Sequence, residues 1–423
     1  MNIICDVLPE LIVYKYISNR FFSPEYYTNG KIAIHQVIKS TILDLLNKKI
    51  CRMGDIVMKY FCMPSDFKNE TIDKYYEINN KYEYSKIIET FGQLAPDTVF
   101  GSCRSPRGLP EVDMHKLEDY VRYCSEKDIE FNYVINATCM SNEELTKPGY
   151  KKVKDFFKML EGIGVGWVTI SLPSLMEIAK YIAPNLKIKA STVCQINSPL
   201  KAKFYEELGI KRIVLDEDIY REFNTLRSIR KVYSGDIEII INSFCVNDCP
   251  FKMFHYNSFS HSHINRDECT YFNSRCNYMH IGAEKYMKLN WIRPEDIHYY
   301  NDIGINYFKL QGRTNVHSGD PAKAVTHYIE ENFDGDLISL LELFSSSKPF
   351  TIAGCKINNS KLDGFFDKFV DDPCFCTKVC SECGYCKSFA EKSIGNADIA
   401  FLEIMDLMKG AATNMFINEL DKE

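Results

Sequence analysis

The sequence predicts an α/β fold: a (β/α)8 barrel of the triosephosphate-isomerase type, with an N-terminal extension and a small cysteine-rich C-terminal region. Through the middle of the chain, short β-branched runs alternate with helical stretches, and eight such units follow one another. Nine of the seventeen cysteines fall in two short windows in the second half of the chain. An open doubly wound sheet would give similar local patterns, so the strand count favours the barrel without excluding the open sheet.

The expected strands are short runs rich in Val, Ile and aromatic residues, which favour a pleated backbone. They cover residues 99–103, 129–136, 167–171, 186–192, 212–216, 237–242, 289–293 and 307–311. Helical patterns follow the first five of these strands at residues 113–127, 149–162, 175–182, 200–208 and 219–233. Pro294 begins a short helix after the seventh strand, because proline is favoured at the first position of a helix.

The expected domain boundaries follow from this alternation. Residues 1–95 are rich in Tyr and Lys and indicate a mostly helical extension. Residues 96–330 form the expected barrel, with a cysteine-bearing insertion at 245–276. Residues 331–423 form the C-terminal region, with a cysteine cluster at 374–386.

Composition limits the compartment and the partners. The N-terminus lacks the basic segment, apolar segment and cleavage site of a secretory signal, and no uncharged apolar run reaches the roughly 18 residues of a membrane span. We therefore expect a cytoplasmic protein without a membrane partner, in which thiols stay reduced. The net charge of −6 argues against broad nonspecific nucleic-acid binding, although 51 Lys and Arg residues leave a structured RNA partner open.

Cys245, Cys249, Cys269 and Cys276 form the first cysteine window. Thiolates are soft ligands, and four of them match the requirement of a [4Fe–4S] cluster or an all-cysteine zinc site. A disulfide framework is the alternative. Such frameworks are typical of small secreted domains, and a chain of 423 residues with 45% hydrophobic residues needs no such support. We expect the four thiolates to bind a cofactor.

The second window holds Cys374, Cys376, Cys380, Cys383 and Cys386. The run from Cys380 to Cys386 has a ferredoxin-like spacing. We expect Cys374, Cys380, Cys383 and Cys386 to bind a second iron–sulfur cluster or zinc, while the spacing leaves the role of Cys376 open. The spacing from Cys376 to Cys383 also matches radical S-adenosylmethionine enzymes. Those enzymes place it after the first barrel strand, whereas here it follows the barrel.

Active sites of such barrels lie at the C-terminal ends of the strands. Three candidate catalytic residues fall there or in the insertion, namely Arg104, Asp216 and His255. Arg104 is suited to clamp a carboxylate or a phosphate, and His255 is suited to bind metal or act on a substrate. A solvated surface side chain is the alternative for both. Three cysteines also fall at strand ends, where a thiol can equally pack as a small buried hydrophobe: Cys103, Cys139 and Cys194.

The sequence resembles peptidase family U32, the collagenase-like group, over roughly residues 96–315. The resemblance rests on several features in the family's order: Ser191-Thr192 at a strand end, the strand at 212–216, the strand leading into Cys245 and Cys249, and the stretches 293–297 and 304–313. The last stretch is similar to a family signature that ends in lysine, isoleucine, glutamate, glycine and arginine. Gln311 stands in place of that glutamate, and Cys245 and Cys249 are closer together than the corresponding cysteines of the family's hydroxylases.

The resemblance implies a barrel with a four-cysteine [4Fe–4S] cluster, which in better understood members supports oxygen-independent hydroxylation of tRNA uridine or of the ubiquinone ring. Other members are described as proteases. We expect an iron–sulfur redox enzyme that modifies a small-molecule, peptide or RNA substrate at the barrel mouth, with a redox protein as a further partner. Two alternatives stay open. One is a U32-type peptidase, although the chain has no Gly-x-Ser-x-Gly elbow and no His-Glu-x-x-His helix. The other is a noncatalytic subunit that is stabilised by metal or carries electrons.

Overall fold

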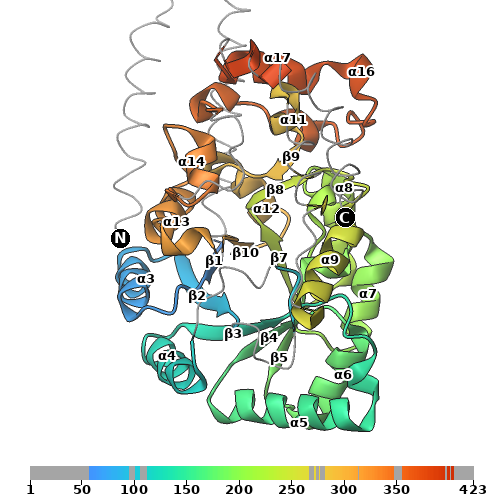
Figure 1. The fold of residues 1–423 in the computed structure, drawn as a ribbon. Helices are drawn as coiled ribbons and strands as arrows, with labels where there is room; N and C mark the ends of the chain where they lie inside the picture. Colours follow the sequence, from blue (N-terminus) through green and yellow to red (C-terminus); the bar gives the residue numbers. More distant parts are fainter. Residues whose placement is uncertain are drawn as a thin grey trace, which may run out of the picture. The chain divides into compact units, whose positions relative to one another are not determined.

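The computed structural model describes residues 57–94, 101–104, 112–265, 271–272, 276, 282–312, 314–346, 355–395, 398–400 and 402–403. All of these except Val57 belong to one compact unit, Met58–Glu423. Eight parallel strands close into a barrel in the order β1-β10-β7-β6-β5-β4-β3-β2 (Figure 1). The predicted (β/α)8 fold is therefore confirmed.

The barrel strands are short, as is usual when each strand is followed by a helix that packs outside the barrel. Their bounds are β1 (Lys59–Pro64), β2 (Ser85–Gly92), β3 (Glu130–Ile135), β4 (Trp167–Ile170), β5 (Lys187–Ala190), β6 (Arg212–Val214), β7 (Asp236–Ile240) and β10 (Tyr307–Lys309). β1 closes the barrel by pairing with β10 on one side and β2 on the other.

Two of the expected barrel strands are not barrel strands in the structure. Residues 101–103, the described part of the expected strand 99–103, form no strand. In the expected strand 289–293, β9 (Leu289–Trp291) pairs antiparallel with β8 (Asn242–Val246) outside the barrel. β1 and β2 take their places, so the barrel begins at Lys59 rather than at residue 96. Residues 1–56 of the expected extension lie outside the described residues.

These errors have a physical cause. A short apolar run predicts a buried strand but does not say with which strand it pairs. The run in β9 is buried against β8 instead of in the barrel wall. In β2, Lys86 and Glu89 interrupt the apolar pattern, yet Glu89 is buried because its carboxylate pairs with Lys189 at 2.7 Å.

The helices that surround the barrel agree with the expected helical stretches from residue 113 to 233. Several begin at a side chain that accepts a hydrogen bond from a free backbone N–H, as with Asp113, Thr146 and Ser198. Their bounds are α3 (Asn69–Lys81), α4 (Met114–Glu126), α5 (Lys147–Gly162), α6 (Pro173–Ile182), α7 (Pro199–Glu207) and α8 (Phe223–Val232). Further along the chain are α9 (Lys252–Asn265), α12 (His298–Asn301), α13 (Pro321–Glu330) and α14 (Leu337–Leu341).

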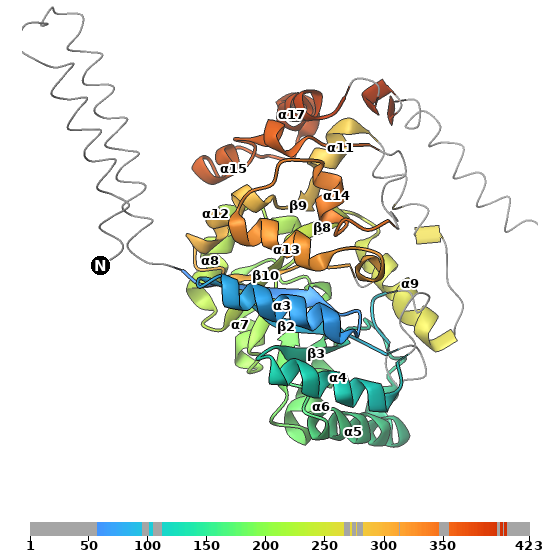
Figure 2. The same cartoon turned by 90° about the vertical axis from the view of Figure 1, so that its left-hand side faces the viewer.

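The C-terminal region packs on the side of the barrel that carries β8 and β9. It contains α15 (Asp367–Asp371), α16 (Cys380–Cys383) and α17 (Tyr385–Ser393), and α17 lies beside α11 (Ala283–Met287) in both views (Figures 1 and 2). Arg293, in the loop after β9, joins the two parts because its guanidinium contacts Asp296 at 2.7 Å and Asp363 at 2.9 Å. None of the described helices has the length and apolar character needed to cross a bilayer.

Candidate active site

A pocket opens at the C-terminal ends of the barrel strands. Its cavity of about 70 Å³ is lined by side chains from several strands, by the loops that follow them and by Tyr256 of α9. The polar and sulfur-bearing lining residues are Cys103, Arg104, Asn136, Ser191, Thr192, Glu217, Cys245, Tyr256, Lys309 and Gln311. Barrels of this type carry their catalytic groups at this end, so the pocket is the candidate active site.

Lys309, the last residue of β10, lies in this pocket and is buried. Burial lowers its pKa to about 8, because the charged ammonium is costly in an apolar environment, and Glu238 only partly offsets that cost. The Nζ atom lies 3.9 Å from the centre of the Phe91 ring. A lysine that is partly neutral near physiological pH can accept a proton or attack a carbonyl group.

A network of buried charges fills the barrel interior. Lys189 Nζ contacts Glu89 at 2.7 Å and Glu238 at 2.6 Å, and Arg212 contacts Glu89 at 3.1 Å. Despite burial, Lys189, Lys309 and Arg212 together lower the pKa of Glu238 to about 2. Arg212 also contacts Asp236 at 3.2 Å, so three carboxylates share this network with the cations of Lys189, Arg212 and Lys309.

The same network contains three potential metal ligands. Atoms of Cys62, Glu89 and Glu238 lie within 4.8 Å of one another, and all three residues are buried. The two carboxylates already have positively charged partners, because Lys189 and Arg212 each contact both of them. Burial raises the pKa of the Cys62 thiol well above its usual value, so the thiolate that a metal needs is disfavoured. We interpret this group as an interior ion-pair network.

Arg104 stands at the edge of the pocket. Its Nη2 atom donates to Gln311 Oε1 at 2.8 Å, and the ring of His263 on α9 contacts the Arg104 carbonyl oxygen at 2.8 Å. Gln311 is held in turn, since its backbone N–H donates to Asn242 Oδ1 at 2.7 Å. The exposed guanidinium thus lies where a carboxylate or phosphate entering the pocket would meet it.

Helix α9 is fastened over the pocket by hydrogen bonds to the loop after β3. Ser260 Oγ accepts from the Thr138 backbone N–H at 2.9 Å, and Thr138 Oγ1 donates to Asn257 at 2.6 Å. Asn136, beside Thr138, donates from Nδ2 to Ser191 Oγ at 3.0 Å and accepts from the Cys103 backbone N–H at 3.1 Å. These bonds fix the positions of three loops around the cavity.

Three consecutive acidic residues anchor the loop of the first cysteine window. The Nζ atom of Lys252, three residues after Cys249, lies 2.6 Å from the carboxylate of Asp216, 3.4 Å from that of Glu217 and 3.1 Å from that of Asp218. Burial raises the pKa of Glu217, and Lys252 only partly opposes that rise. The predicted catalytic candidate Asp216 is therefore buried and paired with Lys252.

The first window brings at least three thiols to this end of the barrel. Cys245 lines the pocket, and burial, Glu217 and the Cys276 thiol raise its pKa well above the usual value. Burial and the Cys249 thiol likewise raise the pKa of Cys276 to about 12. Cys276 therefore interacts with both Cys245 and Cys249. Cys269, the fourth predicted ligand, lies outside the described residues.

The remaining predicted residues have the following positions. His255 is partly buried on α9, where its ring packs 4.5 Å from that of Phe259. Cys103 and Cys194 lie near each other at the pocket end of the barrel, and burial raises the pKa of Cys194 to about 12. Cys139 is partly exposed on the loop after β3. Cys376, Cys380, Cys383 and Cys386 line a separate pocket, whereas Cys374 is not among its lining residues.

Lys309 and Glu217 were missed as site residues by sequence reasoning. Glu217 directly follows the predicted strand 212–216, so its position at a strand end was a signal that could have found it. Lys309 lies inside the predicted strand 307–311, and its place in the signature-like stretch 304–313 was the available signal.

Fold and pocket together define a TIM-type barrel protein with a charged, cysteine-bordered site at the strand ends. The family model of peptidase family U32 matches residues 101–336, more than half of the chain. A relative from Methanocaldococcus jannaschii, named "Uncharacterized protease MJ1657", is 30% identical over 339 residues, which cover 78% of this chain and 97% of the relative. This chain therefore belongs to peptidase family U32.

Two solved structures are similar in fold. The U32 peptidase Mk0906 is 18% identical, with a TM-score of 0.45 over 63% of this chain and 95% of that chain. A mutant tryptophan synthase alpha-subunit from Pyrococcus furiosus is 11% identical, with a TM-score of 0.35 over 66% of this chain and 97% of that chain.

Proposed function

We propose that this protein is an iron–sulfur-dependent redox enzyme of family U32 that modifies its substrate in the pocket at the barrel mouth. One observation carries the proposal: Cys245 of the first window lines the same cavity as Lys309 and Arg104. A cluster held by Cys245, Cys249, Cys269 and Cys276 would therefore border the space in which a substrate binds.

The described residues fit such a cluster. Cys245, Cys249 and Cys276 are partly buried, and thiolate sulfur is the ligand that iron–sulfur clusters use. Arg104 and Lys252 both lower the pKa of Cys245, although burial outweighs them, and their positive charges would favour a thiolate-ligated cluster of net negative charge. A bound [4Fe–4S] cluster supplies one-electron redox or Lewis-acid chemistry.

The chain's own residues supply binding and proton transfer. Arg104 is suited to hold an anionic group of the substrate at the pocket edge, and Lys309 can release or accept a proton at Nζ near neutral pH. Helix α9 limits the entry of water into the cavity, since its Tyr256 lines the cavity and its Ser260 is hydrogen-bonded to Thr138. A cavity of about 70 Å³ is small, so it would take a ring or a side-chain-sized group of a larger substrate.

Two parts of the proposal go beyond the site itself. Oxygen-independent hydroxylation is the candidate reaction, and a one-electron carrier protein is the expected redox partner. Peptide hydrolysis, which the name of the M. jannaschii relative suggests, is the competing activity.

The experiment compares the anaerobically purified protein with Cys249→Ala and with a matched control, Cys139→Ala. Cys139 is a thiol at the same end of the barrel that is not in the proposed ligand set. We expect Cys249→Ala to lose about four irons and about four sulfides per chain, together with the reduced-cluster electron paramagnetic resonance signal of that site. Cys139→Ala should keep both. Equal iron content in all three proteins would contradict the proposal.

A further inference from the structure

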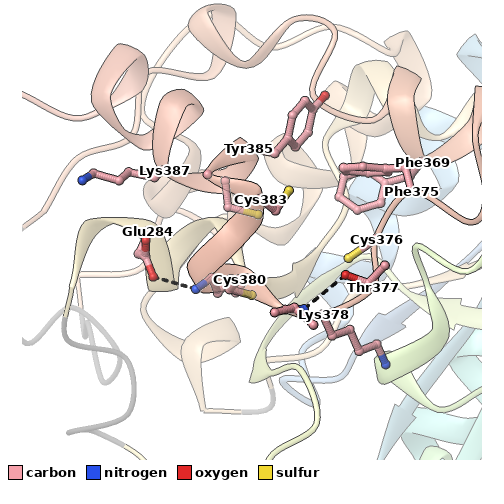
Figure 3. A pocket seen from close by; sticks show the side chains of 14 residues that line it. Glu284, Phe369, Phe375, Cys376, Thr377, Lys378, Cys380, Cys383, Tyr385 and Lys387 are labelled. Atoms are coloured by element: carbon pink, nitrogen blue, oxygen red, sulfur yellow. Dashed lines mark hydrogen bonds and ion pairs between the residues drawn. The ribbon is translucent and has the colours of Figure 1, made fainter.

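A second pocket lies in the C-terminal region, and four cysteines line it. Cys376, Cys380, Cys383 and Cys386 surround a cavity of about 30 Å³ (Figure 3). Three of the four are exposed and Cys386 is partly buried. These four cysteines lie within eleven residues of the sequence. Packing does not require them to gather around one small cavity, because exposed cysteines add little to a hydrophobic core.

The local backbone creates this convergence. Cys380 and Cys383 are the first and last residues of the one-turn helix α16. Gly384 then reverses the chain with a φ of 65°, in the left-handed region that glycine adopts without strain, and α17 starts directly after it. Cys386 is therefore in the first turn of α17. Cys376 approaches from the preceding loop, where Lys378 has a φ of 62°.

Two cationic side chains from distant parts of the chain lie beside the thiols. Lys288 is one of the residues that line the pocket, and the Arg221 guanidinium lies 5.5 Å from the centre of the Phe369 ring in the pocket wall. Arg221 donates to the carbonyl oxygens of Met287 at 2.6 Å and Leu289 at 2.7 Å. Its Nε atom is shielded from solvent and has no hydrogen-bond partner within the described part of the chain. These cations would offset the negative charge of four thiolates.

An aromatic wall shields one side of the pocket. Phe369, Phe375 and Tyr385 line it, and the Phe375 ring lies 4.9 Å from Phe369 and 5.1 Å from Tyr385 (Figure 3). An apolar shell of this kind limits solvent access to a metal centre and so protects thiolates from oxidation.

We propose that Cys376, Cys380, Cys383 and Cys386 bind a [4Fe–4S] cluster, a second metal site separate from the one at the barrel mouth. This ligand set differs from the predicted one, since Cys376 takes the place of Cys374. Cys374 is exposed and is not among the residues that line the pocket. The site stands on this geometry and does not depend on the proposed function.

The spacing of the sulfur atoms favours a cluster over a single zinc ion. Tetrahedral zinc with thiolates at about 2.3 Å requires sulfur atoms about 3.8 Å apart. Among the described residues, Cys62, Glu89 and Glu238 form the one group of three potential ligands whose atoms all lie within 4.8 Å of one another. No three of the four sulfur atoms in the C-terminal pocket are therefore that close together. In the sequence, Cys380, Cys383 and Cys386 follow one another at the ferredoxin-like interval of iron–sulfur ligands.

The second site lies next to the loop of the first cysteine window. Lys378, between Cys376 and Cys380, contacts Asp248 at 2.8 Å and Glu222 at 3.0 Å. Asp248 immediately precedes Cys249. Figure 3 shows the Lys378 side chain extending away from the cysteine pocket, so it links the two windows without occupying the second site.

The experiment uses four full-length proteins purified anaerobically: wild type, Cys380→Ala, Cys376→Ala and Cys374→Ala. Iron, sulfide and zinc are measured per chain, and the same substitutions are repeated in a Cys249→Ala background. Cys380→Ala and Cys376→Ala should each lose about four irons and about four sulfides, whereas the matched control Cys374→Ala should lose none. In the Cys249→Ala background, the iron that remains should disappear with Cys380→Ala.

Three results would overturn the inference. Loss of zinc rather than iron in Cys380→Ala would replace the cluster by a zinc site. Loss of iron in Cys374→Ala with retention in Cys376→Ala would reinstate the predicted ligand set. Unchanged metal content in all variants would remove the site. Circular dichroism of each variant checks that the fold is retained. Because the two cysteine windows are mutated separately, failure here is distinguishable from failure at the barrel mouth.

Discussion

Replacing Lys309 by methionine should stabilise the protein near neutral pH while removing the proton-transfer group from the pocket. The pKa of Lys309 falls from the usual 10.5 to about 8 on folding, because the ammonium is buried and the Lys189 ammonium lies near it. Below pH 8 that burial costs about 3 kcal/mol, since each pKa unit corresponds to about 1.4 kcal/mol. Methionine has a similar length and carries no charge.

The net gain is smaller than the full cost of burial. The Lys309 ammonium also interacts with the Phe91 ring at 3.9 Å, and losing that cation–π contact costs about 1 kcal/mol. We therefore expect Lys309→Met to raise the free energy of unfolding by about 2 kcal/mol at pH 7. Because the unfolded chain binds more protons than the folded chain between pH 8 and 10.5, the penalty in the wild type disappears as pH rises through that window.

Urea unfolding of anaerobic protein at pH 7 and at pH 10 measures this difference. The gain of Lys309→Met over wild type should be largest at pH 7 and should be smaller at pH 10, because the penalty falls as pH rises from 8 to 10.5. Lys211→Met, at an exposed position, is the matched control and should show no such pH dependence. A Lys309→Met protein that is less stable than wild type at pH 7, or a gain that is equal at both pH values, would refute the reasoning.

Two further predictions concern the barrel. Lys189→Met should lower the free energy of unfolding by about 3–5 kcal/mol at pH 7, because Glu89 and Glu238 lose the ammonium at 2.7 and 2.6 Å; the loss should shrink as the pH falls from the usual 4.5 of a glutamate toward the Glu238 pKa of about 2, and an unchanged urea midpoint at pH 7 would contradict it. Gly312→Ala should cost about 1–3 kcal/mol in thermal unfolding, because Gly312 has a φ of 132° and the added Cβ would lie 2.8 Å from Leu343; an unchanged melting temperature would show that the loop relaxes freely.

Sequence patterns predicted the barrel class because six of its eight strands, β3 to β7 and β10, lie in the short runs that were expected to be strands. β1 and β2 were missed, since they lie in the Tyr- and Lys-rich segment 1–95 that was expected to be mostly helical. Glu89 becomes buried only because Lys189, a hundred residues later, provides its partner. No local pattern contains that pairing.

The two cysteine windows show a similar division. Their spacing predicted two metal sites, and the second pocket does gather four of the five predicted thiols. Spacing alone could not choose between Cys374 and Cys376, because both lie on the same side of α16 in sequence and only the fold of the preceding loop decides which one faces the cavity. Lys288 and Arg221 were likewise beyond prediction, since they come from elements far away in the chain.

Redox chemistry by an iron–sulfur cluster at the barrel mouth has a direct test in the visible spectrum of anaerobically purified Cys380→Ala protein, in which only the first window can bind a cluster. We expect a brown protein with broad absorption near ~400 nm that bleaches in air and does not cleave peptides. A colourless, metal-free protein that cleaves peptides, and continues to do so after Cys249→Ala, would instead identify a peptidase.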